Sequence, residues 1–456
     1  MKAAWGRRLA HDILLNVHRG ESLDRELAQA RKSAANAQEA GQIEELVKGA
    51  LQWQNRYDFL IRHFSTKHPT EDPRVRGVMH LALHQLLASS GVPSYAAVHQ
   101  AGELCRAVGR PRAVGYVNAV LQSVVRHVDS AEAASPLDAV HELFLDPTGE
   151  VVDYLTDWWS YPNWMVQRWL ERYGEAETEQ LLRHANQPPP VTLHVLPGHD
   201  RDQAQQTLAD HDIIAAPVPD FERALRLETR LDRAALREVL VNMPQLLVQD
   251  AGAQQVVDWL TREGADLAKA EFPVADICAA PGGKAAHLRV LLTPDQPLLT
   301  MDLRPRRLRR TRKNRDRMEL SGMPLLAGDG LNPPIRRASL AAVMLDGPCS
   351  GTGVGRHHPE GRWRLEYGTI ADNGERLLGL ARSAAELLVP GGRLYYATCS
   401  LEPEENEQVM TALLEGESLL EPDPDADGSW HRAWLPWRLA TDGFFAARLR
   451  RRPGKD

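Results

Sequence analysis

Apolar positions in the first part of the chain recur at the spacing of an α-helix. The pattern is clear in RRLAHDILLNV, IEELVKGALQW, VRGVMHLALHQLL and VNAVLQSVVRHV, and short breaks with proline or glycine separate such segments. It predicts an all-α domain over residues 1–128, followed by a helical connector over 129–186. The connector is dense in tryptophan: Trp158, Trp159, Trp164 and Trp169. Such a cluster is more often packed core than a stacking surface for bases, so we favour core and keep stacking as the alternative.

The pattern changes near residue 187. Short β-like runs, TLHVL, IIAAPVPD and LRLET, alternate with two helical segments and indicate a small α+β module over 187–243. Over 244–456, strand patterns alternate with helices, which predicts a parallel sheet with helices on both faces. The strand candidates are 272–278, 297–302, 323–329, 340–346 and 392–399. HRAWLPWRL and GFFAARLRR indicate a terminal antiparallel pair, so the expected fold is multidomain: all-α, α+β and α/β.

Composition narrows the class of protein. The chain has 456 residues, 25% of them charged, and a net charge of -7, which fits a globular protein of two or three domains. It has no run of 18 apolar residues, and charges interrupt the apolar part of its N-terminus, so we expect neither a membrane span nor a signal peptide. Its four scattered cysteines argue against a disulfide scaffold or a zinc ribbon, and a cytoplasmic location is expected.

Positive charge is concentrated in two places although the balance is acidic. RPRRLRRTRKNRDR, residues 304–317, carries nine basic residues, and RLRRRP, residues 448–453, carries four arginines. Charge alone slightly favours solvated surface faces. The alternative is a surface that contacts nucleic-acid phosphates.

Four predicted strands end in, or run directly into, an aspartate: Asp276, Asp302, Asp329 and Asp346. One such residue alone is readily a helix cap. Four on successive parallel strands would line one edge of the sheet, where carboxylates can hold a ligand that carries hydroxyl and amino groups. Gly282 and Gly283 follow Asp276 and would let the backbone approach that ligand. The segment matches neither the dinucleotide fingerprint nor a phosphate-binding P-loop.

Two cysteines lie just after predicted strands at this same edge. Cys349 stands in DGPCSGTGV and Cys399 in YATCSLEPEEN. A buried cysteine is usually a small apolar residue, which is the interpretation for Cys105 and Cys278. At the ligand edge, a thiolate is also a good nucleophile toward an electron-poor carbon. Position alone balances the two interpretations for Cys349 and Cys399.

The motifs taken together resemble one family, the S-adenosylmethionine-dependent RNA cytosine-5 methyltransferases of the NOL1/NOP2/Sun group. CAAPGGK, MDLRPRRL, GDG, DGPCSGTGVGRHHPE and YATCSLEPEENE match the family's motifs in order and spacing. The helical N-terminal part is similar to the NusB-type RNA-binding domain. In bacteria this combination resembles enzymes that methylate 16S ribosomal RNA. The resemblance implies a Rossmann-like methyltransferase domain with S-adenosylmethionine as its cofactor and RNA, in the first place 16S ribosomal RNA, as its partner.

The resemblance also implies roles for individual residues. Cys399 would add to carbon 6 of the cytosine as nucleophile, and Cys349 would help to remove the proton from carbon 5 and to release the enzyme. Asp346 would lie between cofactor and base, Asp302 would bind the ribose, and Asp329 would lie near the adenine. The cofactor loop would consist of Cys278, Ala279, Ala280, Pro281, Gly282, Gly283 and Lys284. No metal is expected, because no second cluster supports the pair His357 and His358.

Other hypotheses stay open at this point. The enzyme could modify transfer RNA or another ribosomal site, or the protein could be an RNA-binding assembly factor without catalysis; the intact cysteines and aspartates argue against the last. Arg362 and Gly374 stand where the family often has lysine and glutamine, which bears on the RNA contacts. The acidic run Glu404–Glu407 is expected to begin the helix after Cys399.

Overall fold

The computed structural model describes residues 2–66, 69–89, 91–145, 149–229, 233–262, 267, 270–415 and 419–453. The chain forms two compact units, each discontinuous in sequence. The first comprises Met1–Gln187 and Gly355–Arg364, and the second comprises Pro188–Val354 and Leu365–Asp456. No helix in the described ranges is long and apolar enough to cross a membrane.

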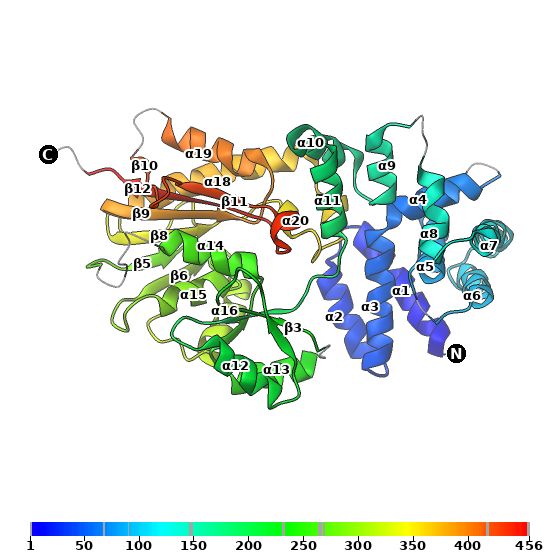
Figure 1. Cartoon of the computed structure of the whole chain (residues 1–456), viewed down its shortest axis with the longest axis horizontal. Coiled ribbons are helices and arrows are strands. Elements are labelled where there is room, and N and C mark those ends of the chain that lie inside the picture. The colour runs from blue at the N-terminus through cyan, green and yellow to red at the C-terminus, as the bar shows by residue number, and fades with distance from the viewer. Residues whose placement is uncertain are drawn as a thin grey trace. The chain divides into compact units, whose positions relative to one another are not determined.

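The first unit is entirely helical in its described part (Figure 1). Its α-helices are α1 (Lys2–His18), α2 (Leu23–Ser33), α3 (Ala37–Gln52), α4 (Gln54–Phe64), α5 (Pro73–Leu87), α6 (Ser94–Ala107), α7 (Val114–Ser130), α8 (Pro136–His141), α9 (Val151–Trp158), α10 (Asn163–Tyr173), α11 (Glu175–Ala185) and α17 (Gly361–Arg364). Short 3-10 turns lie at Pro111–Ala113 and Glu142–Phe144. The predicted all-α N-terminal domain is therefore confirmed.

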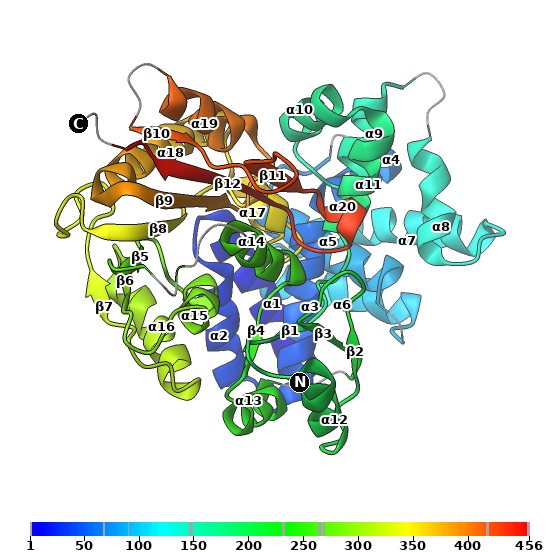
Figure 2. The ribbon, with the colours of Figure 1, turned by 60° about the vertical axis from the view of Figure 1, so that its left-hand side comes forward.

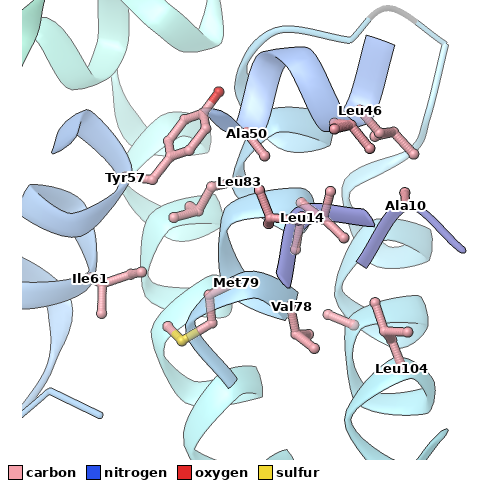
Figure 3. Close-up of a cluster of buried hydrophobic side chains, with 14 of the residues drawn as sticks. Ala10, Leu14, Leu46, Ala50, Tyr57, Ile61, Val78, Met79, Leu83 and Leu104 are labelled. Carbon is pink, nitrogen blue, oxygen red and sulfur yellow. The ribbon is translucent and has the colours of Figure 1, made fainter. Parts of the chain in front are cut away.

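The helical spacing of apolar residues produces one continuous core in this unit. Helix α5 begins at Pro73, and the Asp72 side chain caps it by accepting a hydrogen bond from the Arg74 amide at 3.0 Å. Figure 3 shows side chains of this core, among them Leu14 and Leu83, which are fully buried. The helix N-terminus is thus fixed by a polar cap, while packing against neighbouring helices supplies most of its stability.

The tryptophan-rich connector forms core, as favoured from the sequence. Trp169 is 1% exposed and Trp158 is 8% exposed. The guanidinium of Arg56 lies 3.8 Å from the ring centres of both Trp53 and Trp158, and its Nε donates to the Trp158 carbonyl at 2.8 Å. Trp158 is covered by a cation and by packing and Trp169 is buried, so neither is a stacking surface.

The second unit opens with the predicted small α+β module. Its sheet has the order β2-β3-β1-β4, and all of its pairs are antiparallel. The strands are β1 (Thr192–Val195), β2 (Ala215–Pro217), β3 (Ala224–Leu227) and β4 (Leu246–Val248), with helices α12 (Arg201–Ala209) and α13 (Arg233–Asn242). Its core is apolar and includes Leu193, Leu208 and Leu225. The expected boundary at residue 243 falls inside one compact unit and stays a prediction.

The larger sheet has the order β10-β12-β9-β8-β5-β6-β7, with β11 paired to β12. Its strands are β5 (Val274–Asp276), β6 (Leu298–Asp302), β7 (Leu325–Ala327), β8 (Leu340–Asp346), β9 (Leu388–Thr398), β10 (Leu420–Pro422), β11 (His431–Trp434) and β12 (Phe444–Arg451). Strands β5 to β9 are parallel to one another, whereas β10, β11 and β12 pair antiparallel. The five predicted parallel strands and the terminal antiparallel pair are confirmed.

Helices cover both faces of the larger sheet (Figures 1 and 2). They are α14 (Ala251–Thr261), α15 (Gly283–Val290), α16 (Pro305–Arg317), α18 (Tyr367–Leu387) and α19 (Glu407–Leu414), with the short α20 (Pro436–Leu439) before β12. One apolar core joins α18 and α19 to the sheet, and a second joins α14 and α15 to the other face. Because β5 to β9 run in parallel, their carboxyl ends meet at a single edge, which positions the site.

Candidate active site

The two cysteines singled out from the sequence lie in contact. Strands β8 and β9 are parallel neighbours, with Asp346 paired to Ala397, so the loops that follow leave the same edge of the sheet. The sulfur atoms of Cys349 and Cys399 are 3.3 Å apart, and both residues are half-buried. The hydrogen bond with the Cys399 thiol, together with burial, raises the pKa of Cys349, so this thiol is protonated at neutral pH.

A close approach of backbones fixes the two cysteine loops to each other. The Gly353 amide donates to the Cys399 carbonyl at 2.9 Å, and the Gly443 amide donates to the Gly353 carbonyl at 2.8 Å. A Cβ on Gly353 would lie 2.4 Å from the Gly443 carbonyl oxygen, so only glycine fits. Thr352 adds a hydroxyl that accepts from the Leu401 amide at 2.9 Å. The loops after β8 and β9 therefore behave as one ordered structure.

A lysine–aspartate pair lies at the same edge. Lys284 Nζ, at the start of α15, is 2.8 Å from Asp346 Oδ1 and 2.9 Å from Oδ2. Nζ also lies 5.0 Å from the centre of the Phe444 ring. Burial opposes the charge of Lys284, but the Asp346 carboxylate outweighs it and raises the pKa of the lysine. The two contacts with Lys284 Nζ hold the Asp346 carboxylate in a fixed orientation.

The segment from Cys278 to Lys284 lies against the end of β6. Asp302 Oδ2 accepts from the Ala280 amide at 3.3 Å, and its Oδ1 accepts from the Arg304 amide at 2.8 Å. Gly282 has φ 103°, and a Cβ there would lie 2.8 Å from Thr311 Cγ2, so the turn requires glycine. Of the two glycines noted in the sequence, Gly282 serves this tight turn beside Asp302, whereas Gly283 begins helix α15.

Asp276 adds a buried carboxyl group beneath this turn. It is 1% exposed, its Oδ1 accepts from the Cys278 amide at 3.2 Å, and its Oδ2 has no hydrogen-bond partner among the described residues. Burial and, next, the Asp346 carboxylate raise the pKa of Asp276 to about 8. Burial also raises the pKa of the Cys278 thiol, which is therefore a poor nucleophile. An orphaned buried oxygen at the ligand edge fits a site that accepts a polar ligand group.

The remaining strand-end aspartate is more exposed. Asp329 follows β7, and its Oδ1 accepts from the Leu331 amide at 3.0 Å. Since β6 and β7 pair with Asp302 opposite Ala327, Asp329 lies at the same edge as the other three aspartates. Its carboxylate caps a turn here, and the expected place near an adenine stays a prediction.

Sequence reasoning missed Glu405. The acidic run was expected to begin a helix, but α19 begins only at Glu407, and residues Pro403–Glu405 form a 3-10 turn, labelled η5. Glu405 is 0% exposed, and its carboxylate accepts from the Ser350 amide at 2.7 Å, the Ser350 hydroxyl at 2.6 Å and Asn373 Nδ2 at 2.9 Å. Burial raises the pKa of Glu405, against the effect of these donors. In a charged stretch of sequence, no residue pattern marks one glutamate as buried.

The two departures noted in the sequence have structural partners. Arg362 is buried in the first unit, where its guanidinium lies 3.7 Å from the centre of the Tyr161 ring and Nη1 donates to Asn186 Oδ1 at 3.0 Å. At Gly374, a Cβ would lie 2.4 Å from the Glu404 carbonyl oxygen, so a larger residue cannot fit. Both positions serve packing in this chain. Among the described residues, no group of three or more His, Cys, Asp or Glu side chains could hold a metal ion.

A Rossmann-like sheet with an acidic carboxyl edge, preceded by a separate helical domain, defines a methyltransferase with an appended N-terminal domain. Residues 266–450 match the family 16S rRNA methyltransferase RsmB/F, residues 6–126 match the NusB family, and residues 161–233 match the ferredoxin-like domain of RsmF/B-like methyltransferases. The ribosomal RNA small subunit methyltransferase B of Vibrio cholerae is 30% identical over 440 residues, covering 95% of this chain and 94% of that protein. Its Klebsiella pneumoniae counterpart is 29% identical over 444 residues, covering 96% and 95%. The chain belongs to the 16S rRNA methyltransferase RsmB/F family.

Solved structures support the fold. The crystal structure of PH0851 covers 98% of this chain and 98% of its own, with a TM-score of 0.74 and 21% identity. NSun6 from Pyrococcus horikoshii with SFG covers 65% of this chain and 99% of its own, with a TM-score of 0.52 and 17% identity. At these identities the likeness concerns the fold, and it confirms the predicted Rossmann-like domain.

Proposed function

We propose that this protein methylates carbon 5 of a cytosine in 16S ribosomal RNA through a covalent bond between Cys399 and the base. The observation that carries the proposal is the pair of thiols, 3.3 Å apart, at the carboxyl edge of a methyltransferase sheet. The relatives named ribosomal RNA small subunit methyltransferase B support the substrate. A cytosine-5 reaction has a separate role for each of these two contacting cysteines.

The residues around β5 and β6 fit S-adenosylmethionine. Gly282 lets the loop turn tightly against Thr311, Asp302 offers a carboxylate for ribose hydroxyls, and the buried Oδ2 of Asp276 has no partner among the described residues. When bound, the cofactor supplies an electrophilic methyl group. Segment Cys278–Lys284 and Asp302 would hold it, with Asp329 near the adenine. The solved neighbour that was crystallised with SFG, an analogue of the cofactor, supports this choice.

The cysteines would divide a difficult substitution into easier steps. Carbon 5 of cytosine is a weak nucleophile, and the bond from Cys399 Sγ to carbon 6 makes carbon 5 electron-rich. After carbon 5 gains the methyl group, its proton passes to a base, either water or a Cys349 that has first given up its own proton; the electron pair of that C–H bond restores the carbon 5–carbon 6 double bond, and Cys399 leaves carbon 6 as the thiolate. Cys349, whose sulfur contacts that of Cys399, would assist the loss of the proton and the release of the base.

Asp346 and Lys284 would hold the base in place. The carboxylate of Asp346 is oriented by both of its contacts with Lys284 Nζ, and it lies on the strand that leads to Cys349. A fixed acceptor suits the amino edge of cytosine, which donates hydrogen bonds. Carbon 5 is reached only in an unstacked base, so the target cytosine is unpaired or flipped out of the stack.

The identity of the product tests this proposal. The protein is incubated with methyl-labelled S-adenosylmethionine and unmodified 16S ribosomal RNA transcript, and in parallel with unmodified transfer RNA. We expect label in the ribosomal RNA alone, recovered as 5-methylcytidine after digestion to nucleosides. Label in another nucleoside would contradict the chemistry. Label as 5-methylcytidine in transfer RNA alone would keep the chemistry and overturn the substrate.

A further inference from the structure

Helix α16 (Pro305–Arg317) carries a cationic face that the fold does not use. Its inward side is closed by Thr311, which is 1% exposed, and Leu308, which is 7% exposed. The opposite side exposes five basic residues: Arg306, Arg309, Arg310, Arg312 and Lys313. Within the described ranges, none of these five forms an ion pair or a side-chain hydrogen bond.

Three other arginines of this helix donate hydrogen bonds to backbone carbonyls of the protein itself. Arg307 Nη2 donates to the Ala280 carbonyl at 2.6 Å, and Arg315 Nη1 donates to the Met323 carbonyl at 3.2 Å. Arg317 reaches the carbonyls of Leu240 and Leu246, each at 2.8 Å. The five exposed cations instead repel one another at i,i+3 and i,i+4 spacing, which costs helix stability. The whole chain has a net charge of -7, so this face is a local concentration of positive charge, which a partner of opposite charge would stabilise.

The position of the helix ties this face to the active site. Helix α16 starts directly after β6, where the Arg304 amide donates to Asp302 Oδ1 and Arg307 anchors the segment at Ala280. With a rise of about 1.5 Å per residue, the helix is about 20 Å long. A polyanion bound along it would therefore lead from solvent to the carboxyl edge of the sheet.

We propose that the exposed face of α16 binds the phosphate backbone of the RNA substrate and directs the strand toward the cysteine loops. The inference rests on the proposed function and adds a surface in the methyltransferase domain itself to that function. Guanidinium groups bind phosphate oxygens in a planar, bidentate way, and neutralised phosphates release counterions, so this binding depends on salt. An acidic protein is the other partner that such a face could bind, and the test distinguishes it from RNA.

The test removes four of these charges with R309Q/R310Q/R312Q/K313Q. The matched control, R237Q/R336Q/R376Q/R382Q, removes four exposed arginines elsewhere in the second unit. Affinity for unmodified 16S transcript is measured over a salt series. For four lost phosphate contacts we expect the slope of log affinity against log salt to become shallower by about three in the α16 variant. The control keeps the wild-type slope to within about one phosphate contact.

Two further measurements distinguish a loss of RNA binding from a loss of folding or of cofactor binding. The thermal shift on adding S-adenosylhomocysteine should be the same for wild type and both variants, which shows intact folding and cofactor binding. The KM for RNA should rise in the α16 variant with little change in kcat. Equal slopes for both variants would overturn the proposal, and so would a wild-type slope in the α16 variant. If wild type binds RNA with this slope but transfers no methyl group, the proposed function fails while the surface stands.

A second observation concerns the buried Glu405. Its carboxylate accepts from both the amide and the hydroxyl of Ser350, the residue after Cys349, and from Asn373 on α18. Gly374 allows α18 to pack directly against the Glu404 carbonyl, beside Glu405. The Glu405 side chain thus connects its own loop, after β9, with the loop after β8 and with helix α18.

We infer that Glu405 is a positioning residue for Cys349. It acts on the backbone next to the thiol and keeps that thiol against Cys399, so it matters at the step that Cys349 assists. This inference, too, rests on the proposed function. It predicts that loss of Glu405 slows release of the product and leaves the first methyl transfer largely intact.

Glu405→Gln and Glu405→Ala separate positioning from charge. A glutamine oxygen can accept from the Ser350 amide and Asn373, and its amide can donate to the Ser350 hydroxyl, so activity should fall less than about threefold. Alanine frees the loop, and multiple turnover should fall by about 100-fold, as expected when a reacting group is misplaced by about 1 Å. The first turnover should change little, and a protein–RNA adduct should accumulate.

Other outcomes would overturn the inference. Equal losses in both variants would mean that the charge of the carboxylate itself acts in the reaction. Normal turnover in Glu405→Ala would mean that the loop needs no such support. If Glu405→Ala does not fold, Ser350→Ala provides the test, because it removes the hydrogen bond from the Ser350 hydroxyl to Glu405. More protein–RNA adduct than in the wild type supports a positioning role for Glu405. No increase in adduct contradicts it. A wild type that makes no 5-methylcytidine would refute the proposed function instead.

Discussion

Cys399→Ala is expected to abolish methyl transfer. Removing a covalent nucleophile costs a factor on the order of 10⁴ or more, because the remaining groups cannot make carbon 5 nucleophilic. The substitution leaves the loop in place, since the backbone carbonyl of residue 399, not its side chain, accepts from Gly353. The measurement is the initial rate of label incorporation into 16S transcript, together with the thermal shift on adding S-adenosylhomocysteine.

Cys105→Ala is the matched control. Cys105 is 0% exposed in the core of the first unit, and burial raises the pKa of its thiol, so it serves packing. Its loss should lower the melting temperature slightly and leave the rate unchanged. A Cys399→Ala protein that is folded, binds S-adenosylhomocysteine and retains a tenth or more of the wild-type rate, about 1.4 kcal/mol in barrier, would exclude Cys399 as nucleophile.

Cys349→Ala should have the opposite signature, accumulation of a covalent protein–RNA adduct. The Cys349 thiol contacts that of Cys399, and its raised pKa makes Cys349 a poor nucleophile, so its proposed role falls after the attack by Cys399. Without it, the enzyme forms the bond to carbon 6 and is released slowly. On a denaturing gel, most of the variant should migrate as an adduct with 16S transcript when S-adenosylmethionine is present.

The double variant Cys349→Ala/Cys399→Ala controls this experiment. It lacks the proposed nucleophile and should give no adduct under the same conditions. An adduct that persists in the double variant would place the covalent bond on another residue. An adduct in Cys399→Ala but not in Cys349→Ala would exchange the roles of the two cysteines.

The sequence predicts most of the sheet because buried strands are marked by continuous apolar runs. Strand β8 has the predicted bounds, Leu340–Asp346, and its terminal aspartate lies at the predicted edge. Strand β7 is shorter than the predicted 323–329, since only Leu325–Ala327 pair with β6. Edge strands carry fewer buried residues, so their ends are poorly marked in a sequence.

Long-range contacts account for what the sequence could not show. Arg362, noted as a departure near the cysteine motif, belongs to the first unit and packs on Tyr161. Glu405 is one of several glutamates in a short stretch, and only the fold separates the buried Glu402 and Glu405 from the half-buried Glu404 and Glu407. Lys284 was expected in the cofactor loop, whereas the structure adds its ion pair with Asp346, 62 positions away along the chain. Residue type and spacing carry no signal for such pairs.

The most direct test of the account is the identity of the cross-linked residue in Cys349→Ala. The adduct with 16S transcript is digested with protease and nuclease, and the peptide that carries a nucleotide is sequenced by mass spectrometry. We predict a single cytidine-derived nucleotide attached to Cys399. Attachment to Cys278, to any other residue, or to a nucleotide other than cytidine would contradict the proposed mechanism.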